Sequence, residues 1–332
     1  MRVIDAAGEP HELGRQVGAA APDLVARAVA LTCRLELSED ELERRLSAIE
    51  QRLTAAFPSV LDESDGLAQG AGIATRDALV LSVCGDLTGR LPGWCTLAAL
   101  PGASGPLLAK NLDTRPELRE LQVIERLSPA GGLGYTHLTM AGSMWTDGGL
   151  NQAGLALVNS SLQAGSGNAD GVPDGILARE VLARCSDVEE ALTLIGSLDV
   201  RTNGENLVLA DAGGATALVS KLPAGQSIRR GGALTATNHP LDDELLEAMD
   251  ADDPIADNSR RRYARLTELT STAQQWGLAE LERLLAAPGI AQDGDAGLHT
   301  VAALVIDPAG RRLRVASDSP AFARFDEIEV RP

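Results

Sequence analysis

Blocks with a helical pattern alternate along this chain with pairs of short apolar runs, and this order restricts the fold more than any other feature. Residues 1–90 are predicted to be mainly helical, and 173–197 and 241–287 form two further helical blocks. Strand pairs joined by short turns form antiparallel sheets, so the helices between them are expected to cover sheet faces. The order therefore predicts an α+β chain folded as a four-layer αββα sandwich with a helical N-terminal segment.

The short apolar runs are separated by turns that contain glycine, a pattern typical of β-strands. They comprise residues 96–100, 107–112, 121–127, 154–158, 207–210, 215–219, 300–306 and 313–316. Asp211-Ala212-Gly213-Gly214 and Asp307-Pro308-Ala309-Gly310 are the predicted turns of two hairpins. Since no long linker interrupts the pattern, a single domain is the simplest interpretation.

Local signals mark where several helices begin. Ser38-Glu39-Asp40-Glu41 and Ser186-Asp187-Val188-Glu189 both have the pattern of a capping box. Thr75 is predicted to cap another short helix, and the stretch from His11 to Leu31 reads as one long helical run. These signals assign most of the N-terminal block to helices.

The charge of the chain argues against several classes of partner. Its 332 residues include 47 acidic and 29 basic side chains, which gives a formal net charge of −18. An acidic chain without a basic run binds nucleic acid and anionic membranes poorly. No apolar run approaches the roughly 18 residues of a membrane helix, and no apolar signal-peptide core follows Met1. We therefore expect a cytoplasmic protein that binds neither nucleic acid nor membrane.

One of the four cysteines stands apart by its position. Cys33, Cys84 and Cys185 lie in helical patterns, where cysteine is commonly a small core residue. Cys95 instead begins the first strand, in Gly93-Trp94-Cys95-Thr96, and the return strand ends at Asp113. A hairpin could bring Asp113 near Cys95. From the residues alone Cys95 is a candidate nucleophile, with a buried structural thiol as the commoner alternative.

Other motifs that could bind a cofactor or a metal are weak. Gly165-Ser166-Gly167 and Gly70-Ala71-Gly72 lack the strand–turn–helix context of a dinucleotide site. Asp293-Gly294-Asp295 lacks the later ligands of a calcium loop. The four histidines show no ligand-like spacing. The sequence therefore predicts no resident cofactor and no metal.

Several short motifs occur in an order that matches a known family. They are Gly8-Glu9-Pro10-His11-Glu12-Leu13-Gly14 with Gly18, Cys95-Thr96, Asn111-Leu112-Asp113, the stretch 149–155, Gly171-Val172-Pro173, Thr237-Asn238-His239, Ser259…Arg262…Arg265 and Pro320. In this order and spacing the chain resembles the isopenicillin N acyltransferase family of autoproteolytic N-terminal-nucleophile hydrolases. The resemblance spans nearly the whole chain and implies the same αββα sandwich.

The resemblance also implies that the chain cuts itself between Trp94 and Cys95. A helical segment, 1–94, and a catalytic segment, 95–332, would then stay associated as two chains of one structural domain. An N-terminal cysteine carries a nucleophile and a base on one residue, since the thiol pKa is about 8.5 and the α-amino pKa about 7.7–8.0. No catalytic histidine is then required.

By the same resemblance, further residues acquire roles. Asn238 is expected to donate to the oxyanion of the transition state, and Asp113 to orient the α-amino group. Thr96 is expected to position the cysteine backbone. The sequence departs from the family at Trp94, where glycine is common, and at Gly297, where the penicillin-forming enzyme has arginine. His299 and Thr300 are the residues expected to line the pocket instead.

The expected reaction is formation of an acyl-enzyme on Cys95 from a linear amide or thioester, followed by transfer to an amine or to water. The partners would be a small acyl donor and an amine acceptor, with acyl-coenzyme A as a conceivable co-substrate; a homo-oligomer stays open. Since aromatic residues make up only 2% of the chain, we expect aliphatic side chains to line the pocket and the acyl group to be aliphatic. The alternative is a self-cleaving homologue that binds an acylated ligand without turnover.

Overall fold

Two β-sheets form the centre of the molecule. The computed structural model describes residues 1–33, 35–89, 93–250, 255–271, 275–294 and 297–330. Within them, an eight-stranded sheet has the order β1 (Arg2–Gly8), β4 (Gln122–Pro129), β5 (Tyr135–Met140), β6 (Gly148–Asn151), β7 (Leu155–Ser161), β8 (Glu205–Asp211), β9 (Thr216–Leu222), β10 (Gly225–Arg230). A six-stranded sheet has the order β11 (Leu234–Ala236), β2 (Gly93–Gly102), β3 (Gly105–Thr114), β12 (His299–Asp307), β13 (Arg312–Ala316), β14 (Asp326–Ile328).

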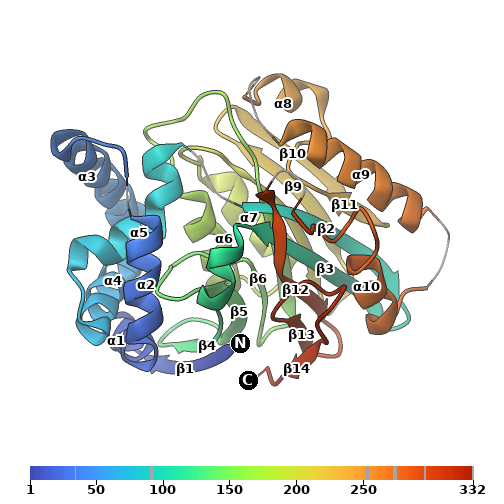
Figure 1. Ribbon diagram of the computed structural model, residues 1–332, viewed down its shortest axis with the longest axis horizontal. Helices are drawn as coiled ribbons and strands as arrows, with labels where there is room; N and C mark the ends of the chain where they lie inside the picture. Colours follow the sequence, from blue (N-terminus) through green and yellow to red (C-terminus); the bar gives the residue numbers. More distant parts are fainter. Residues whose placement is uncertain (34, 90–92, 251–254, 272–274, 295–296, 331–332) are drawn as a thin grey trace.

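Helices cover the outer faces of both sheets (Figure 1). On the eight-stranded sheet lie α1 (Pro10–Ala20), α2 (Pro22–Thr32), α3 (Glu39–Ala56), α4 (Pro58–Ala71), α5 (Thr75–Thr88), α6 (Asp174–Arg184) and α7 (Val188–Ser197). On the six-stranded sheet lie α9 (Ala256–Thr270) and α10 (Leu278–Leu285). The short helix α8 (Asp243–Glu247) packs near β10, and the 3₁₀ helix η1 (Pro116–Leu121) follows β3.

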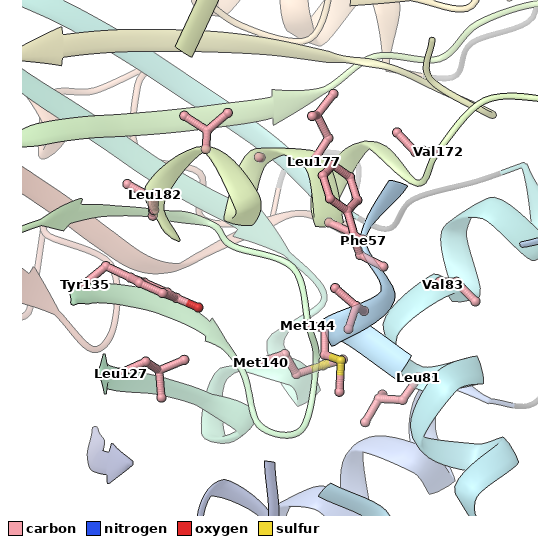
Figure 2. Packing of buried hydrophobic residues seen from close by; sticks show 14 of the residues in the cluster. Phe57, Leu81, Val83, Leu127, Tyr135, Met140, Met144, Val172, Leu177 and Leu182 are labelled. Atoms are coloured by element: carbon pink, nitrogen blue, oxygen red, sulfur yellow. The ribbon is translucent and has the colours of Figure 1, made fainter. Parts of the chain in front are cut away.

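Three hydrophobic clusters separate these layers. One fills the space between the helices α1–α7 and the eight-stranded sheet, and Figure 2 shows part of it. A second lies between the two sheets, and the third lies between the six-stranded sheet and α9 and α10. The central strands of each sheet are buried on both faces, whereas the edge strands β1, β10 and β14 are partly exposed. The structure therefore confirms the predicted four-layer αββα sandwich.

Glycines allow α1 and α4 to pack with their backbones in contact. Gly14 and Gly18 on α1 face Gly66 and Gly70 on α4. A Cβ atom on Gly14 would lie 2.0 Å from the carbonyl oxygen of Glu63, and one on Gly66 would lie 1.9 Å from that of His11. No real Cβ contact is that short, so any side chain at these positions would force the two helices apart.

Residues 1–90 were predicted to be mainly helical, but their first segment is a strand. Residues 2–8 form β1, which pairs in parallel with β4; alternate burial of Ile4 and Ala6 marks it as a strand. The run from His11 to Leu31 is broken at Ala21, which is not helical, because Pro22 lacks an N–H and begins α2. The helical prediction for residues 1–90 therefore holds from α1 to α5 but not for β1.

Of the three predicted helix N-caps, one is confirmed, one is shifted by a residue and one is wrong. Ser38 caps α3 as predicted, since its Oγ accepts a hydrogen bond from the Glu41 N–H at 3.3 Å. The second N-cap is Asp187, one residue after the predicted Ser186. The Asp187 carboxylate accepts a hydrogen bond from the Glu190 N–H at 2.9 Å. The prediction that Thr75 caps α5 is wrong. Thr75 is already inside that helix, which starts without a side-chain cap.

The predicted strands are present, but β5, β6, β10, β11 and β14 were not predicted. The block 241–287 divides into α8, α9 and α10, while its residues 251–254 and 272–274 lie outside the described part of the chain. Asp295, named above, also lies outside it. None of the described helices is long and apolar enough to span a membrane.

Candidate active site

Cys95 lies near the start of β2 with its side chain between the two sheets. It is only 3% exposed and belongs to the cluster between the sheets, together with Leu97 and Ala99 on the same strand face. Burial raises the pKa of the Cys95 thiol to about 12, and the positive charge of Lys110 opposes that rise. In the uncleaved chain the thiol is therefore protonated at neutral pH.

A pocket opens beside Cys95. The cavity has a volume of about 100 Å³, enough for several water molecules. Its walls come mainly from α5, β2, β3, β7, the N-terminus of α6 and the start of β8, with further residues from α2, η1, β4, β5 and the segment 145–147. Since Cys95 lines this pocket, a small molecule bound there would meet its sulfur.

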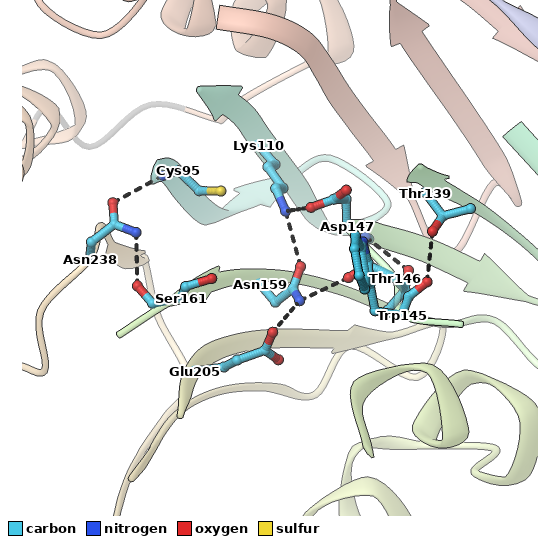
Figure 3. Close-up of polar contacts among 11 residues, drawn as sticks. Cys95, Lys110, Thr139, Trp145, Thr146, Asp147, Asn159, Ser161, Glu205 and Asn238 are labelled. Carbon is cyan, nitrogen blue, oxygen red and sulfur yellow. Dashed lines mark hydrogen bonds and ion pairs between the residues drawn. The ribbon is translucent and has the colours of Figure 1, made fainter. Parts of the chain in front are cut away.

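Lys110 of β3 carries a buried positive charge on the pocket wall. Its side chain is 1% exposed, and Nζ donates to Asp147 Oδ1 at 3.1 Å and to Asn159 Oδ1 at 3.0 Å (Figure 3). Burial works against the charge, but Asp147, Cys95 and Glu205 together raise the pKa of Lys110 above its usual value. The ammonium group therefore persists beside the thiol.

Asn238 contacts the backbone of Cys95 directly. Its Oδ1 accepts a hydrogen bond from the Cys95 N–H at 3.0 Å, and its Nδ2 donates to the Ser161 carbonyl at 2.8 Å. That backbone nitrogen belongs to the peptide bond between Trp94 and Cys95. The amide of Asn238 is thus fixed with its oxygen toward this bond, while one of the two Nδ2 hydrogens is used by Ser161.

Arg262 of α9 binds the other side of the same residue. Its Nη1 donates to the Cys95 carbonyl at 2.5 Å and to Thr96 Oγ1 at 3.1 Å, and its Nη2 donates to Asn238 Oδ1 at 2.8 Å. Nε donates to Asn258 Oδ1 at 2.7 Å. Arg262 is 1% exposed. Its guanidinium therefore links Cys95, Thr96 and Asn238 in one buried network.

Ser259 and His239 hold the loop that carries Asn238. Ser259 Oγ accepts from the Asn238 N–H at 2.9 Å and lies 2.7 Å from His239 Nδ1. Burial lowers the pKa of His239 to about 4, with Arg260 and Arg262 as further causes. His239 is therefore neutral at physiological pH and supports the loop through a hydrogen bond.

Asp113 lies on the opposite face of the six-stranded sheet from the Cys95 side chain. It pairs with Trp94 on β2 and with Thr300 on β12. Thr300 Oγ1 donates to Asp113 Oδ1 at 2.5 Å, whereas Oδ2 is buried with no hydrogen-bond partner among the described residues. Burial raises the pKa of Asp113 to about 6, against the effects of Arg262 and Thr300. The predicted hairpin exists and aligns Asp113 with Trp94.

Of the other predicted site residues, Thr96 and Thr300 make buried hydrogen bonds around Cys95 and Asp113, and His299 does not line the pocket. Thr96 is buried and accepts from Arg262, and Thr300 is buried against Asp113. His299 is half-buried beside Gly294. Neither His299 nor Thr300 is among the residues on the wall of the pocket beside Cys95. The register explains the position of Thr300, since it pairs with Asp113 and shares its outer face.

Sequence reasoning missed several residues of this site. Lys110, Asp147, Asn159 and Glu205 were not predicted, and Arg262 was noted only as part of a motif. One signal in the sequence could have indicated that Arg262 is buried. It lies four residues before the apolar Leu266, so both side chains share a face of α9. Among the described residues, no group of three His, Cys, Asp or Glu side chains is arranged to hold a metal ion.

Comparisons with known proteins agree with this architecture. The model of the family described as acyl-coenzyme A:6-aminopenicillanic acid acyl-transferase matches residues 101–321, a span that includes Lys110, Asp113 and Asn238 but begins after Cys95. No curated protein matches the chain by sequence.

Solved structures share the fold at low sequence identity. Two variants of the conjugated bile acid hydrolase from Clostridium perfringens align with TM-scores of 0.54 and 0.52 at 14% and 13% identity, and each alignment covers 71% of this chain and 92% of the other. The ortholog of N-acylethanolamine-hydrolyzing acid amidase from Caenorhabditis elegans aligns with a TM-score of 0.50 at 15% identity, covering 72% and 100%. The fold is that of the N-terminal-nucleophile hydrolases.

Proposed function

The chain belongs to the acyl-coenzyme A:6-aminopenicillanic acid acyl-transferase family, and from that premise we propose that it is a self-activating cysteine enzyme of acyl transfer. It cuts its own chain between Trp94 and Cys95, forms an acyl-enzyme on Cys95 from a linear amide or thioester, and passes the acyl group to an amine or to water. One observation carries the proposal. The backbone of Cys95 is held by Asn238 at its nitrogen and by Arg262 at its carbonyl, with the thiol in a pocket.

Self-cleavage proceeds in two balanced steps. The Cys95 sulfur attacks the Trp94 carbonyl carbon, the bond from that carbon to the Cys95 nitrogen breaks, and the thiol proton ends on the nitrogen. The resulting thioester is then hydrolysed by water, which leaves a carboxylate on Trp94 and restores the thiol. Asn238 supports the first step, because its Oδ1 already orients the N–H of the bond that breaks.

The freed α-amino group then serves as the base. Asn238 Oδ1 keeps one hydrogen bond to it. Oδ2 of Asp113, which has no hydrogen-bond partner in the described part of the chain, offers a second acceptor near the same strand position. The second hydrogen on Asn238 Nδ2 remains for the oxyanion of the attacked carbonyl. Burial raises the pKa of the Cys95 thiol, and the positive charge of Lys110 opposes that rise and so favours the thiolate.

Turnover uses the same groups on an external substrate. The sulfur attacks the substrate carbonyl, the amine or thiol leaves with the proton from the α-amino group, and an S-acyl bond remains. An incoming amine or water releases the acyl group by the reverse proton transfer. A thioester such as acyl-coenzyme A would act as a substrate, and no resident cofactor takes part.

Intact-mass spectrometry tests the proposal. The wild-type chain of 34.6 kDa is expected to yield two fragments divided before Cys95, and Cys95→Ala is expected to stay whole and inactive. Cys185→Ala, which changes a thiol that does not line the pocket, is the control and should cut normally. A wild-type chain that stays whole and takes up no acyl mass from any amide or thioester would refute it.

Thiol labelling separates the proposal from binding without turnover. In the cleaved enzyme Cys95 is expected to react far faster than Cys33, Cys84 and Cys185, because its pKa falls once the α-amino group is free. The family and the fold favour the enzyme over the alternative. Equal labelling of all four cysteines in cleaved protein would favour ligand binding alone.

A further inference from the structure

The pocket beside Cys95 is acidic on part of its wall. Asp86 at the end of α5, Asp174 at the start of α6 and Glu205 at the start of β8 all line it, in addition to Asp147. The basic side chain on this wall is Lys110, and it is already paired with Asp147. Three carboxyl groups from three different elements therefore converge on one pocket. No salt bridge joins any of them to a cation among the described residues, although the charge of Arg201 acts on Asp86 and that of Lys110 acts on Glu205.

Each of these three carboxyl groups is held by neutral donors. Asp174 accepts from the Gly175 N–H at 2.8 Å and the Gly204 N–H at 2.7 Å. Asp86 accepts from Thr202 Oγ1 at 3.1 Å, and Glu205 accepts from Asn159 Nδ2 at 2.9 Å. These contacts fix where the carboxyl groups point but do not neutralise them.

Glu205 supplies the observation that points to a ligand. It is 5% exposed, and its Oε2 is buried without a hydrogen-bond partner among the described residues. A buried acceptor without a donor is costly. Figure 3 shows that Asn159 and Lys110 connect this carboxyl group to the neighbourhood of Cys95. A donor bound in the pocket would supply the missing partner close to the reacting sulfur.

Burial dominates the pKa values of this cluster. Burial, followed by the charge of Asp174, raises the pKa of both Glu205 and Asp86 well above the usual range. Burial also raises the pKa of Asp174. The charges of Arg201 and Lys110 only partly offset this rise in pKa, and a cation bound between the carboxyl groups would lower their pKa values further.

The same pocket has an apolar part. Leu112, Leu118 and Met140 contribute aliphatic walls to it. The site therefore offers two different environments to a substrate whose carbonyl carbon lies at Cys95, one suited to hydrocarbon and one suited to positive charge.

Resting on the function proposed above, we propose that the amine portion of the substrate carries a second, positively charged nitrogen, which binds at Asp86, Asp174 and Glu205. The acyl chain packs on Leu112, Leu118 and Met140. The substrate class is thus an amide of a diamine, or of another amine that bears an ammonium group, and in the transferase direction such an amine is the acceptor.

A matched series of amides tests this inference. All three members carry a butanoyl group on a four-carbon amine chain that ends in ammonium, methyl or carboxylate. We expect kcat/KM to be highest for the ammonium amide, by about tenfold or more over the methyl amide, since a charge-assisted contact is worth that much. The carboxylate amide should be the poorest substrate. Equal rates for the ammonium and methyl amides would overturn the inference.

Substitutions of the pocket carboxyl groups test whether they cause the preference for the ammonium amide. Asp86→Asn and Glu205→Gln preserve the shape and the hydrogen-bond acceptors, and each should shrink the preference for ammonium over methyl. Asp62→Asn removes a charge from the exposed surface of α4 and should leave the preference unchanged. A preference that survives both pocket substitutions would show that the charge is recognised elsewhere, against the inference.

A binding measurement separates this inference from the proposed function. Titration calorimetry of the full-length Cys95→Ala chain with the same three amides needs no cleavage and no turnover. The ammonium amide should bind about tenfold more tightly than the methyl amide. If it does while no acyl-enzyme ever forms on the wild type, only the proposed function fails. If the enzyme is active but ammonium gives no advantage, only the inference fails.

Discussion

A single buried guanidinium determines the geometry around Cys95. Arg262 donates to the carbonyl of Cys95, to Thr96 and to Asn238, three groups that come from β2 and from the loop after β11. Lysine carries one nitrogen and cannot reproduce this forked arrangement. The residue that aligns the candidate nucleophile thus lies far from it in the sequence.

We expect Arg262→Lys to slow self-cleavage and to destabilise the fold by about 2–4 kcal/mol, because buried acceptors lose their donors. Urea unfolding in the Cys95→Ala background measures the stability, and the time course of fragment appearance measures cleavage in the wild-type background. The exposed Arg260→Lys is the matched control. Unchanged cleavage in Arg262→Lys would show that its network does not position Cys95.

Asp113 should make stability depend on pH. Its pKa is about 6 in the folded chain against an ordinary 3.8, so the folded state holds the proton more tightly than the unfolded state. The stabilisation from this group is complete below pH of about 4 and is lost as the pH rises through about 6. The full effect is on the order of 2–3 kcal/mol.

The test uses Cys95→Ala, which stays uncleaved. Between pH 4 and pH 7, Asp113→Asn in this background should become steadily more stable relative to Cys95→Ala alone, because the amide never ionises. Thermal unfolding at intervals of pH gives the comparison. A stability difference that is constant over this range would mean that burial does not raise the pKa of Asp113.

At the scale of elements, the contact between α1 and α4 depends on glycine. The pairs Gly14/Gly18 and Gly66/Gly70 are each spaced by four residues, which puts both members of a pair on one helix face. The sequence shows this spacing, but it does not say which helix faces which. The tertiary structure shows that the two glycine faces meet each other.

We therefore expect Gly66→Ala to destabilise the protein by about 1–3 kcal/mol, since its Cβ would overlap the His11 carbonyl. Gly196→Ala on α7 is the control. Its Cβ would meet only the end of the Gln226 side chain at 3.5 Å, so the better helix propensity of alanine should leave stability equal or slightly higher. Denaturant midpoints compare the two. If both substitutions behaved alike, close packing would not explain these glycines.

At the scale of the whole molecule, the segment before Cys95 is built into the fold. β1 pairs along its length with β4, and α1 to α5 share one hydrophobic cluster with α6 and α7. Arg179 of α6 donates to both carboxylate oxygens of Glu63 on α4, at 2.5 and 3.0 Å, in a buried ion pair. Cutting one peptide bond before Cys95 breaks none of these contacts.

We predict that the two fragments stay together after cleavage. Size-exclusion chromatography of cleaved protein should give one peak with both fragments, and they should separate only in denaturant. Glu63→Gln should loosen them by leaving the charge of Arg179 buried and unpaired, at a cost of about 3–5 kcal/mol. Elution of the smaller fragment by itself from wild-type protein would contradict the prediction.

Much of the fold could be predicted because its signals are local. Helical periodicity, the cap at Ser38 and glycine turns each act over a few residues, and together they gave the order of layers. The prediction failed where local signals compete with distant pairing. β1 forms a strand because β4 lies beside it, and the long run from His11 breaks where Pro22 removes a donor.

The sequence by itself determined the fold class, the family and Cys95 as the candidate nucleophile, because these depend on the order and spacing of residues along the chain. Only the tertiary structure decided which side chains share the pocket. Strand register directs Lys110 toward Cys95 and Asp113 to the other face, and the packing of α9 brings Arg262 to the backbone. Register and packing arise from contacts between distant segments, and no local pattern records them.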